Sequence, residues 1–142
     1  LEKGYRAWSS DITPNDTPFQ AGLGWAVKMK GNTPFLGREA LSAAAGAPLG
    51  KRFVGFTLDD PDAVLLGRET ILRNGKPVGY LTSGGYGYTV GKSIGYGYVR
   101  ADDTSDDALQ AGDYALIVAG ETLPAQIGLR PFYDPDGTRI RA

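Results

Sequence analysis

A run in which glycine and tyrosine alternate, between Gly79 and Arg100, is the strongest constraint on what this chain can fold into. It holds five of the eight tyrosines of the chain. Successive side chains of a β-strand point to opposite faces, so each bulky ring in such a run faces away from a bare glycine. The pattern therefore predicts a strand, a turn and a second strand.

The same run contains a near match to a phosphate-binding loop, at Gly91-Lys92-Ser93. That signature requires a glycine five residues before Gly91, because the intervening amides must wrap a phosphate, and Tyr86 occupies this position. The dinucleotide-binding pattern fails in the same way, because Val90 stands where its third glycine belongs. Both spacings favour a glycine-rich hairpin over a nucleotide site.

The composition excludes several kinds of chemistry. The chain has 15 basic and 16 acidic residues among 142 and no block of five like charges, so nothing indicates a nucleic-acid surface. It has no cysteine and no histidine, which removes thiolate chemistry and the commonest zinc ligands. The acidic cluster from Asp102 to Asp107 lacks the glycine and the final glutamate of a calcium loop, so we expect a solvated loop and no metal site. No apolar run approaches the ~20 residues of a membrane span.

The first third of the chain carries turn residues, one alternating segment and one short helix. Leu23, Trp25, Val27 and Met29 alternate with smaller or charged residues, which predicts a strand with its large apolar groups on one face. Trp25 could be a core residue or the wall of a pocket, and the pattern alone favours the core. A turn over 31–34 and a helix over 35–45 follow, and Gly46, Pro48 and Gly50 end the helix. We place a domain boundary at 48–50.

Beyond this boundary the sequence predicts short strands separated by turns. A strand over 52–58 is followed by two strands that flank Asn74-Gly75, the most typical hairpin turn, in which both residues tolerate positive φ. Pro77 belongs at an edge or at an unpaired position. The last strands, over 93–99, 114–119 and 122–129, include a hairpin across Gly120-Glu121 with glycine at the first turn position. About six strands with few helices indicate a small antiparallel barrel or sandwich.

Candidate chemical groups lie near the N-terminus. Glu2, Asp11 and Asp16 could in principle do acid–base work, but their spacing matches no catalytic template, which favours surface or turn roles. Arg6 beside Trp8 could hold an anionic or planar ligand, and ordinary surface packing explains the pair equally well. These residues alone indicate a mostly antiparallel β module of unassigned function.

Several motifs together resemble the glycine-cleavage T-protein (aminomethyltransferase) family, in the form found in dimethylglycine and sarcosine dehydrogenases. They cover nearly the whole chain: Leu1-Glu2-Lys3-Gly4-Tyr5-Arg6-Ala7-Trp8, Ala21-Gly22-Leu23-Gly24-Trp25-Ala26-Val27-Lys28, Phe35-Leu36-Gly37-Arg38-Glu39-Ala40-Leu41, Arg73-Asn74-Gly75-Lys76-Pro77-Val78-Gly79, Thr82-Ser83-Gly84, Gly112-Asp113-Tyr114-Ala115-Leu116 and Pro131-Phe132-Tyr133-Asp134-Pro135.

The resemblance implies a mainly β protein, α+β overall, in two parts. Residues 1–48 would be the C-terminal part of the folate-binding aminomethyltransferase domain, and residues 49–142 an antiparallel six-stranded, Greek-key-like β-barrel. The chain begins at Leu1 without a methionine and reads as the middle of a folded segment, so we expect a fragment of a longer polypeptide. In the family's dehydrogenases an FAD domain oxidises an N-methyl group, and the one-carbon unit passes to tetrahydrofolate.

The resemblance carries few site residues onto this chain. It makes Trp25 an aromatic wall of the folate site, which reverses the preference for the core, and it places Glu2 and Trp8 near that site. It implies no catalytic residue here, because the family's catalytic aspartate lies earlier in the module. The fragment alone would then be inactive.

The partners and the setting follow from the same resemblance. The partners would be the preceding part of the polypeptide, folate and a methylated amine, with no nucleic acid or membrane. The location would be bacterial cytoplasm or mitochondrial matrix. A stand-alone aminomethyltransferase and a non-catalytic folate-binding regulatory relative remain the alternatives.

Overall fold

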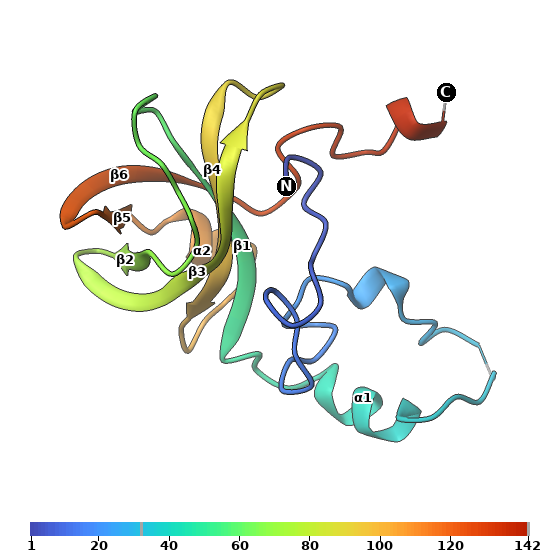
Figure 1. The fold of residues 1–142 in the computed structure, drawn as a ribbon. Coiled ribbons are helices and arrows are strands. Elements are labelled where there is room, and N and C mark those ends of the chain that lie inside the picture. Colours follow the sequence, from blue (N-terminus) through green and yellow to red (C-terminus); the bar gives the residue numbers. More distant parts are fainter. Residues whose placement is uncertain (32, 142) are drawn as a thin grey trace.

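The computed structural model describes residues 1–31 and 33–141 and shows a closed β-barrel with a long N-terminal extension (Figure 1). Six antiparallel strands close the barrel in the order β1-β4-β3-β2-β5-β6. The strands are β1 (Lys51–Leu58), β2 (Thr70–Arg73), β3 (Lys76–Gly87), β4 (Lys92–Arg100), β5 (Tyr114–Val118) and β6 (Glu121–Gly128). Consecutive hairpins join β2, β3 and β4, and β1 lies beside β4, which is the Greek-key arrangement that the resemblance implies.

Short helices accompany the barrel without forming a layer of their own. They are η1 (Gly24–Ala26), α1 (Arg38–Ala44), α2 (Asp106–Gln110) and η2 (Arg139–Arg141). Ser105 caps α2 by accepting a hydrogen bond from the amide of Ala108, and Leu109 of α2 is buried in the barrel core. The helix predicted over 35–45 is present as α1. The turn predicted over 31–34 includes Asn32, which lies outside the described residues.

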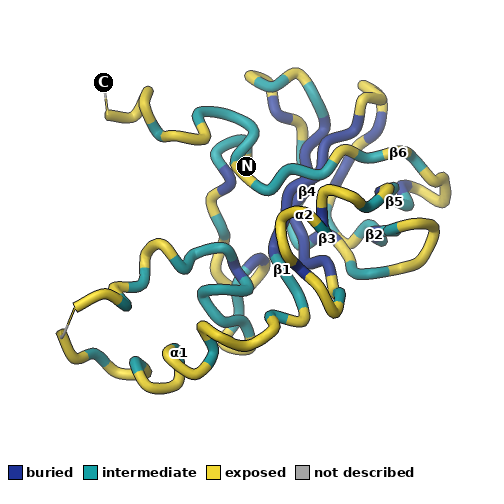
Figure 2. The backbone as a smooth tube through the Cα atoms, turned by 180° about the vertical axis from the view of Figure 1, so that it is seen from behind, coloured by how far each residue is buried: buried dark blue, intermediate teal, exposed yellow. Residues whose placement is uncertain are grey.

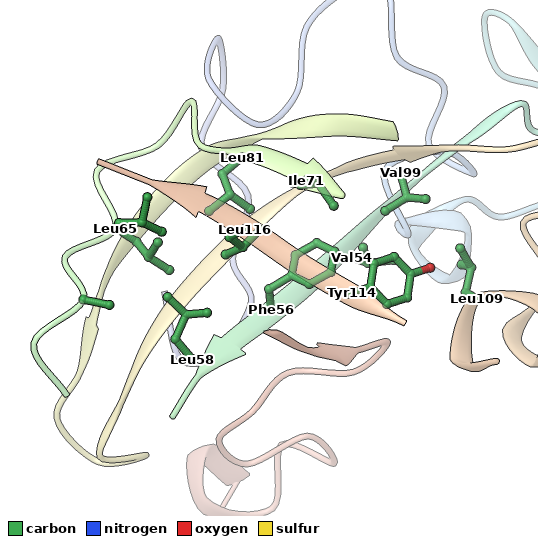
Figure 3. Close-up of a cluster of buried hydrophobic side chains, with 12 residues drawn as sticks. Val54, Phe56, Leu58, Leu65, Ile71, Leu81, Val99, Leu109, Tyr114 and Leu116 are labelled. Atoms are coloured by element: carbon green, nitrogen blue, oxygen red, sulfur yellow. The ribbon is translucent and has the colours of Figure 1, made fainter. Parts of the chain in front are cut away.

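The barrel interior is filled by alternate residues of the strands. Val54, Phe56 and Leu58 of β1 share it with Val99 of β4 and Leu116 of β5, as Figure 3 shows. Because the side-chain period is two, Ile94, Tyr96 and Tyr98 of β4 point outwards, where they pack with Phe53. We call these four residues the outer cluster. The predicted split of β4 into two faces is confirmed.

The alternating run forms the β3–β4 hairpin, as predicted, and its glycines let the two strands approach closely. A Cβ atom on Gly97 would lie 2.3 Å from the backbone oxygen of Tyr80. In the phosphate-loop-like segment, Lys92 forms an ion pair with Asp59. The hydroxyl of Ser93 donates to the buried carbonyl of Ala63. Both polar groups are therefore used in holding the loop after β1.

The β2–β3 turn lies where the sequence predicts it, whereas the β5–β6 turn does not. Asn74 and Gly75 have φ of 51° and 74°, as the predicted hairpin requires, and Pro77 lies at a register shift outside the β3–β4 pairing. The second hairpin is displaced by one residue from its prediction. Its turn is Ala119-Gly120, so Ala119 takes the first position with φ of 50° and Glu121 already belongs to β6.

The predicted strand over 23–29 is wrong. The segment forms η1 and irregular backbone, in which the amides of Ala26 and Val27 donate to the carbonyls of Leu23 and Gly24. A strand needs a neighbour with free backbone groups, and the six strands of the barrel close on one another and leave no such edge. The backbone groups of this segment therefore pair locally.

Candidate functional site

The N-terminal extension has two parts with different relations to the barrel. Residues 1–22, which we call the strap, lie against the outer cluster. Residues 23–48, which we call the arm, project from it and carry α1 (Figure 1). Figure 2 shows that exposed residues predominate along the arm, and neither η1 nor α1 has a buried residue.

Asp11 is the central polar residue of the junction between strap and barrel. It is only 2% exposed, so the predicted surface role is wrong, whereas the predicted turn role is confirmed because Asp11 lies in a turn. Its Oδ1 accepts from the hydroxyl of Thr82 at 2.5 Å and its Oδ2 from the amide of Ala7 at 2.9 Å. Its carbonyl accepts from the hydroxyl of Tyr98 at 2.9 Å. The carboxylate is fully hydrogen-bonded, which is the condition under which a buried charge is tolerated.

The barrel supplies irregular backbone at the same place. The register of β3 against β4 shifts between Leu81 and Ser83, so Thr82 is the extra residue of a β-bulge. A bulge turns its residue away from the regular alternation, which brings the Thr82 hydroxyl to Asp11. No local pattern in the sequence marks this contact, because 71 residues separate Thr82 from Asp11.

Asp16 and Lys51 form a second link between strap and barrel. Lys51 Nζ lies 2.5 Å from Asp16 Oδ1 and 4.8 Å from the centre of the Tyr98 ring. Burial raises the pKa of Asp16, but hydrogen bonds from Lys51 and Thr13 outweigh it, so the net pKa is lowered.. Burial, together with the charges of Asp16 and Asp11, raises the pKa of Tyr98, which keeps its hydroxyl protonated as a donor.

Arg6 is the strap residue that covers the outer cluster. Its guanidinium lies 5.3 Å from the centre of the Phe53 ring, and Nε and Nη1 donate to the carbonyls of Ala21 and Gly4. The Arg6 guanidinium is thus hydrogen-bonded within the strap. The structure supports packing for Arg6, the ordinary alternative that the sequence left open.

The three residues predicted near folate lie in different surroundings. Trp25 of η1 is 83% exposed, so the preference for a core role that the pattern alone gave is wrong. Trp8 is 69% exposed and lies at the bend of the strap, where it bridges to Ile12. Glu2 Oε1 accepts from the amides of Thr89 and Val90 at 2.6 and 2.9 Å, which ties the strap to the β3–β4 turn.

A polar cavity of about 360 Å³ opens where strap and barrel meet. Its floor is formed by Asp11, Asp16, Lys51 and Tyr98, and its rim includes Tyr80 and Arg100. A second cavity of about 590 Å³ adjoins it and shares Ser10, Tyr80 and Thr82 as lining. Neither cavity is lined by Trp25, Glu2 or Trp8.

Two kinds of site have no basis in the part of the chain that the structure describes. In residues 1–31 and 33–141 no group of three or more acidic side chains is placed to hold a metal ion. Among the same residues, no helix has the length and apolar character needed to cross a bilayer.

The fold and the junction define a small barrel module that carries an exposed aromatic arm. Residues 51–134 match the family model described as the glycine cleavage T-protein C-terminal barrel domain. The chain therefore belongs to the glycine cleavage T-protein family.

Relatives of known name agree with this assignment. Mitochondrial sarcosine dehydrogenase of Homo sapiens is 41% identical over 99% of this chain, and mitochondrial dimethylglycine dehydrogenase of Homo sapiens is 35% identical over 99%. This chain spans about a sixth of the length of each, 16%. The crystal structure of glycine cleavage system aminomethyltransferase T from Bartonella henselae superposes with a TM-score of 0.74 at 25% identity, over 94% of this chain and 37% of that one.

Proposed function

We propose that this chain is the C-terminal, tetrahydrofolate-side module of an FAD-dependent dehydrogenase acting on dimethylglycine or sarcosine. The observation that carries the proposal is the similarity to sarcosine dehydrogenase along 99% of this chain at 41% identity. The similarity includes the arm and the strap as well as the barrel. In this proposal the parent protein passes a one-carbon unit to tetrahydrofolate and works in the mitochondrial matrix or the bacterial cytoplasm.

The residues of this chain fit folate as one wall of its site. The indole of Trp25 is 83% exposed, so its face is available to stack on a planar ring. Folate, when bound, supplies the acceptor for the one-carbon unit, and the arm's part would be to bind and orient it. Trp8 is a second exposed ring, whereas Glu2 would act by holding the strap on the β3–β4 turn.

The preceding part of the polypeptide is the proposed partner of the arm. Both helices of the arm lack buried residues, and Leu36 beside α1 is fully exposed. Because the arm buries so little of its surface on this chain, we propose that the folate-binding body covers it. On this proposal residues 1–48 complete that body, residues 49–142 form the supporting barrel, and FAD belongs to a domain outside this chain.

Replacing Trp25 by alanine in the full-length protein tests the proposal. We expect weaker tetrahydrofolate binding in an equilibrium titration, by about tenfold, since stacking on a buried aromatic contributes on the order of 1 kcal/mol or more. Oxidation of the amine with an artificial electron acceptor should stay nearly unchanged. Tyr88→Ala, at an exposed ring on the β3–β4 turn, is the control. Equal loss of folate binding and amine oxidation would assign Trp25 a structural role.

The fragment itself offers a simpler test. We expect no turnover of dimethylglycine or sarcosine by the 142 residues alone. Measurable turnover without an added domain or flavin would contradict the proposal.

A stand-alone aminomethyltransferase is the second candidate, and the superposition on the Bartonella henselae enzyme supports it. The sequence that precedes Leu1 in the full-length protein separates the two, because only the dehydrogenase requires a flavin domain there. A regulatory folate-binding relative would lack the catalytic aspartate in the same region.

A further inference from the structure

Two arginines differ from all the others in this chain. Seven of the nine have a hydrogen-bond or ion-pair acceptor for the guanidinium among residues 1–31 and 33–141: Arg6, Arg38, Arg52, Arg73, Arg130, Arg139 and Arg141. Within that described part, Arg68 and Arg100 have none. They are also the two arginines that line the adjoining cavities beside the strap.

The two carboxylates on the cavity floor already have hydrogen-bond partners within the protein. Asp16 accepts from Lys51 and Thr13, and Asp11 accepts from Thr82 and Ala7. All four carboxylate oxygens are thus engaged within the protein. Among the described residues that line the two cavities, Lys51 already pairs with Asp16, so the cationic groups without an acidic partner are the two guanidinium groups. Each presents a planar fork that suits a carboxylate.

Backbone contacts fix the spacing of the two arginines. The amide of Arg68 donates to the carbonyl of Leu81 at 2.7 Å, and Arg100 follows Val99, which pairs with Gly79. Arg68 lies beside β3 on its β2 side and Arg100 lies in β4 on the other side, so the two backbones are two to three residues apart along β3, roughly 7–10 Å, and two strand spacings apart across the sheet, roughly 10 Å. The resulting separation of the two backbones is about 12–14 Å. Tyr80 lies between them, is 52% exposed and lines both cavities.

We propose that the two adjoining cavities bind a small dicarboxylate, one acid group on Arg68 and the other on Arg100, with its apolar spacer on the Tyr80 ring. Singly charged carboxylates fit this floor better than phosphates, because Asp11 and Asp16 repel a more highly charged anion. Volumes of about 360 and 590 Å³ suit a small molecule. The site is independent of the proposed folate wall, since Trp25 lines neither cavity.

Octanedioate is the probe, titrated into the 142-residue chain at low ionic strength and followed by amide chemical shifts. We expect saturable binding with shifts centred on Ser10, Tyr80 and Thr82, the residues that the cavities share. Arg68→Gln and Arg100→Gln should each weaken binding about fivefold, as expected for one partly screened charge-assisted contact. Arg130→Gln, which removes an exposed arginine that already pairs with Asp136, should leave binding unchanged.

The matched ligands decide between this site and ordinary attraction to exposed cations. Octanoate has one acid group, so it can make only one of the two contacts. Its affinity for the unaltered chain should be no higher than the affinity of octanedioate for the Arg68→Gln or Arg100→Gln variant. Equal binding of octanoate and octanedioate, equal loss with Arg130→Gln, or binding of inorganic phosphate as tight as that of octanedioate would each overturn the proposal. An unchanged amide spectrum away from the cavities shows that each variant is folded.

Discussion

Ala119 holds its backbone in the left-handed region, with φ of 50°, at the first position of the β5–β6 turn. In this region the Cβ of an ordinary residue approaches a carbonyl oxygen, which costs roughly 1–2 kcal/mol. The β2–β3 turn has the same geometry but uses Asn74, a residue type that tolerates positive φ. The chain thus contains one well-matched and one strained version of the same turn.

Ala119→Asn should therefore stabilise the protein. We expect the free energy of unfolding to rise by about 0.5–1 kcal/mol, as measured by urea denaturation, because the new turn would match Asn74-Gly75. Asn74→Ala is the reciprocal control and should lower it by at least as much, because Asn74 also accepts a hydrogen bond from the amide of Asp113. A destabilised Ala119→Asn variant would contradict this account.

Asp134 makes the stability of the C-terminal segment depend on pH. Burial raises its pKa, but hydrogen bonds from the amides of Arg139 and Thr138 and from Lys3 outweigh this and hold the pKa at about 2. Since this value lies below that of an unfolded aspartate, about 3.9, the stabilisation is complete above about pH 5 and is lost as the pH falls toward 2.

Asp134→Asn tests this dependence. The difference in free energy of unfolding between wild type and variant should be constant above about pH 5 and shrink between about pH 4 and pH 2. Equilibrium unfolding at a series of pH values measures it. A difference that does not change down to pH 2 would show that the carboxylate contributes through its shape alone.

At the scale of elements, the close contact of β3 and β4 depends on glycine. A Cβ on Gly97 would lie 2.3 Å from the oxygen of Tyr80 and 2.9 Å from the Cα of Leu81, both backbone atoms that cannot move without shifting a strand. We expect Gly97→Ala to lower the free energy of unfolding by about 3 kcal/mol or more, at the upper end of overpacking effects. Chemical denaturation of the purified variant measures this loss.

Gly46→Ala is the matched control, because nothing lies within 4 Å of a Cβ at Gly46. Its effect should stay within about 0.5 kcal/mol, as for most surface substitutions. Similar losses in both variants would contradict this account, because the lower unfolded-state entropy of alanine stabilises both variants and only Gly97 lies at the contact of β3 with β4.

Local chemistry explains which elements the sequence predicts well. Hairpins at Asn74-Gly75 and across the alternating run depend on turn residues and on period-two patterns, both of which act over a few residues. The strand predicted over 23–29 fails because pairing requires a free sheet edge, a property of the whole barrel. The burial of Asp11 is missed for the same reason, since its partners Thr82 and Tyr98 lie 71 and 87 residues away.

At the scale of the whole molecule, packing and hydrogen bonds join the strap to the barrel, whereas the arm is mostly exposed. The strap covers the outer cluster, and Gln20 connects it to the start of β1: its Nε2 donates to the carbonyl of Leu49, and its carbonyl accepts from the amide of Phe53. The two ends of the arm are therefore close in space. The physical unit is the strap with the barrel, while the division at residue 48 that the resemblance implies stays a prediction about function.

Two deletions test this organisation, one removing residues 1–48 and the other replacing the arm, 23–48, by a short Gly-Ser linker. Removing strap and arm exposes Phe53, Tyr96 and Tyr98 of the outer cluster. The expected loss is on the order of 5 kcal/mol, at roughly 1.5–3 kcal/mol for each large apolar side chain, which is close to the whole stability of a typical domain.

Replacing the arm alone removes no buried helix residue and should change the free energy of unfolding by less than about 1 kcal/mol. Thermal and urea unfolding of both deletions beside the full chain measure these values. A barrel of residues 49–142 as stable as the full chain would show that the strap contributes nothing to folding, and an arm replacement as damaging as the longer deletion would make arm and strap one unit.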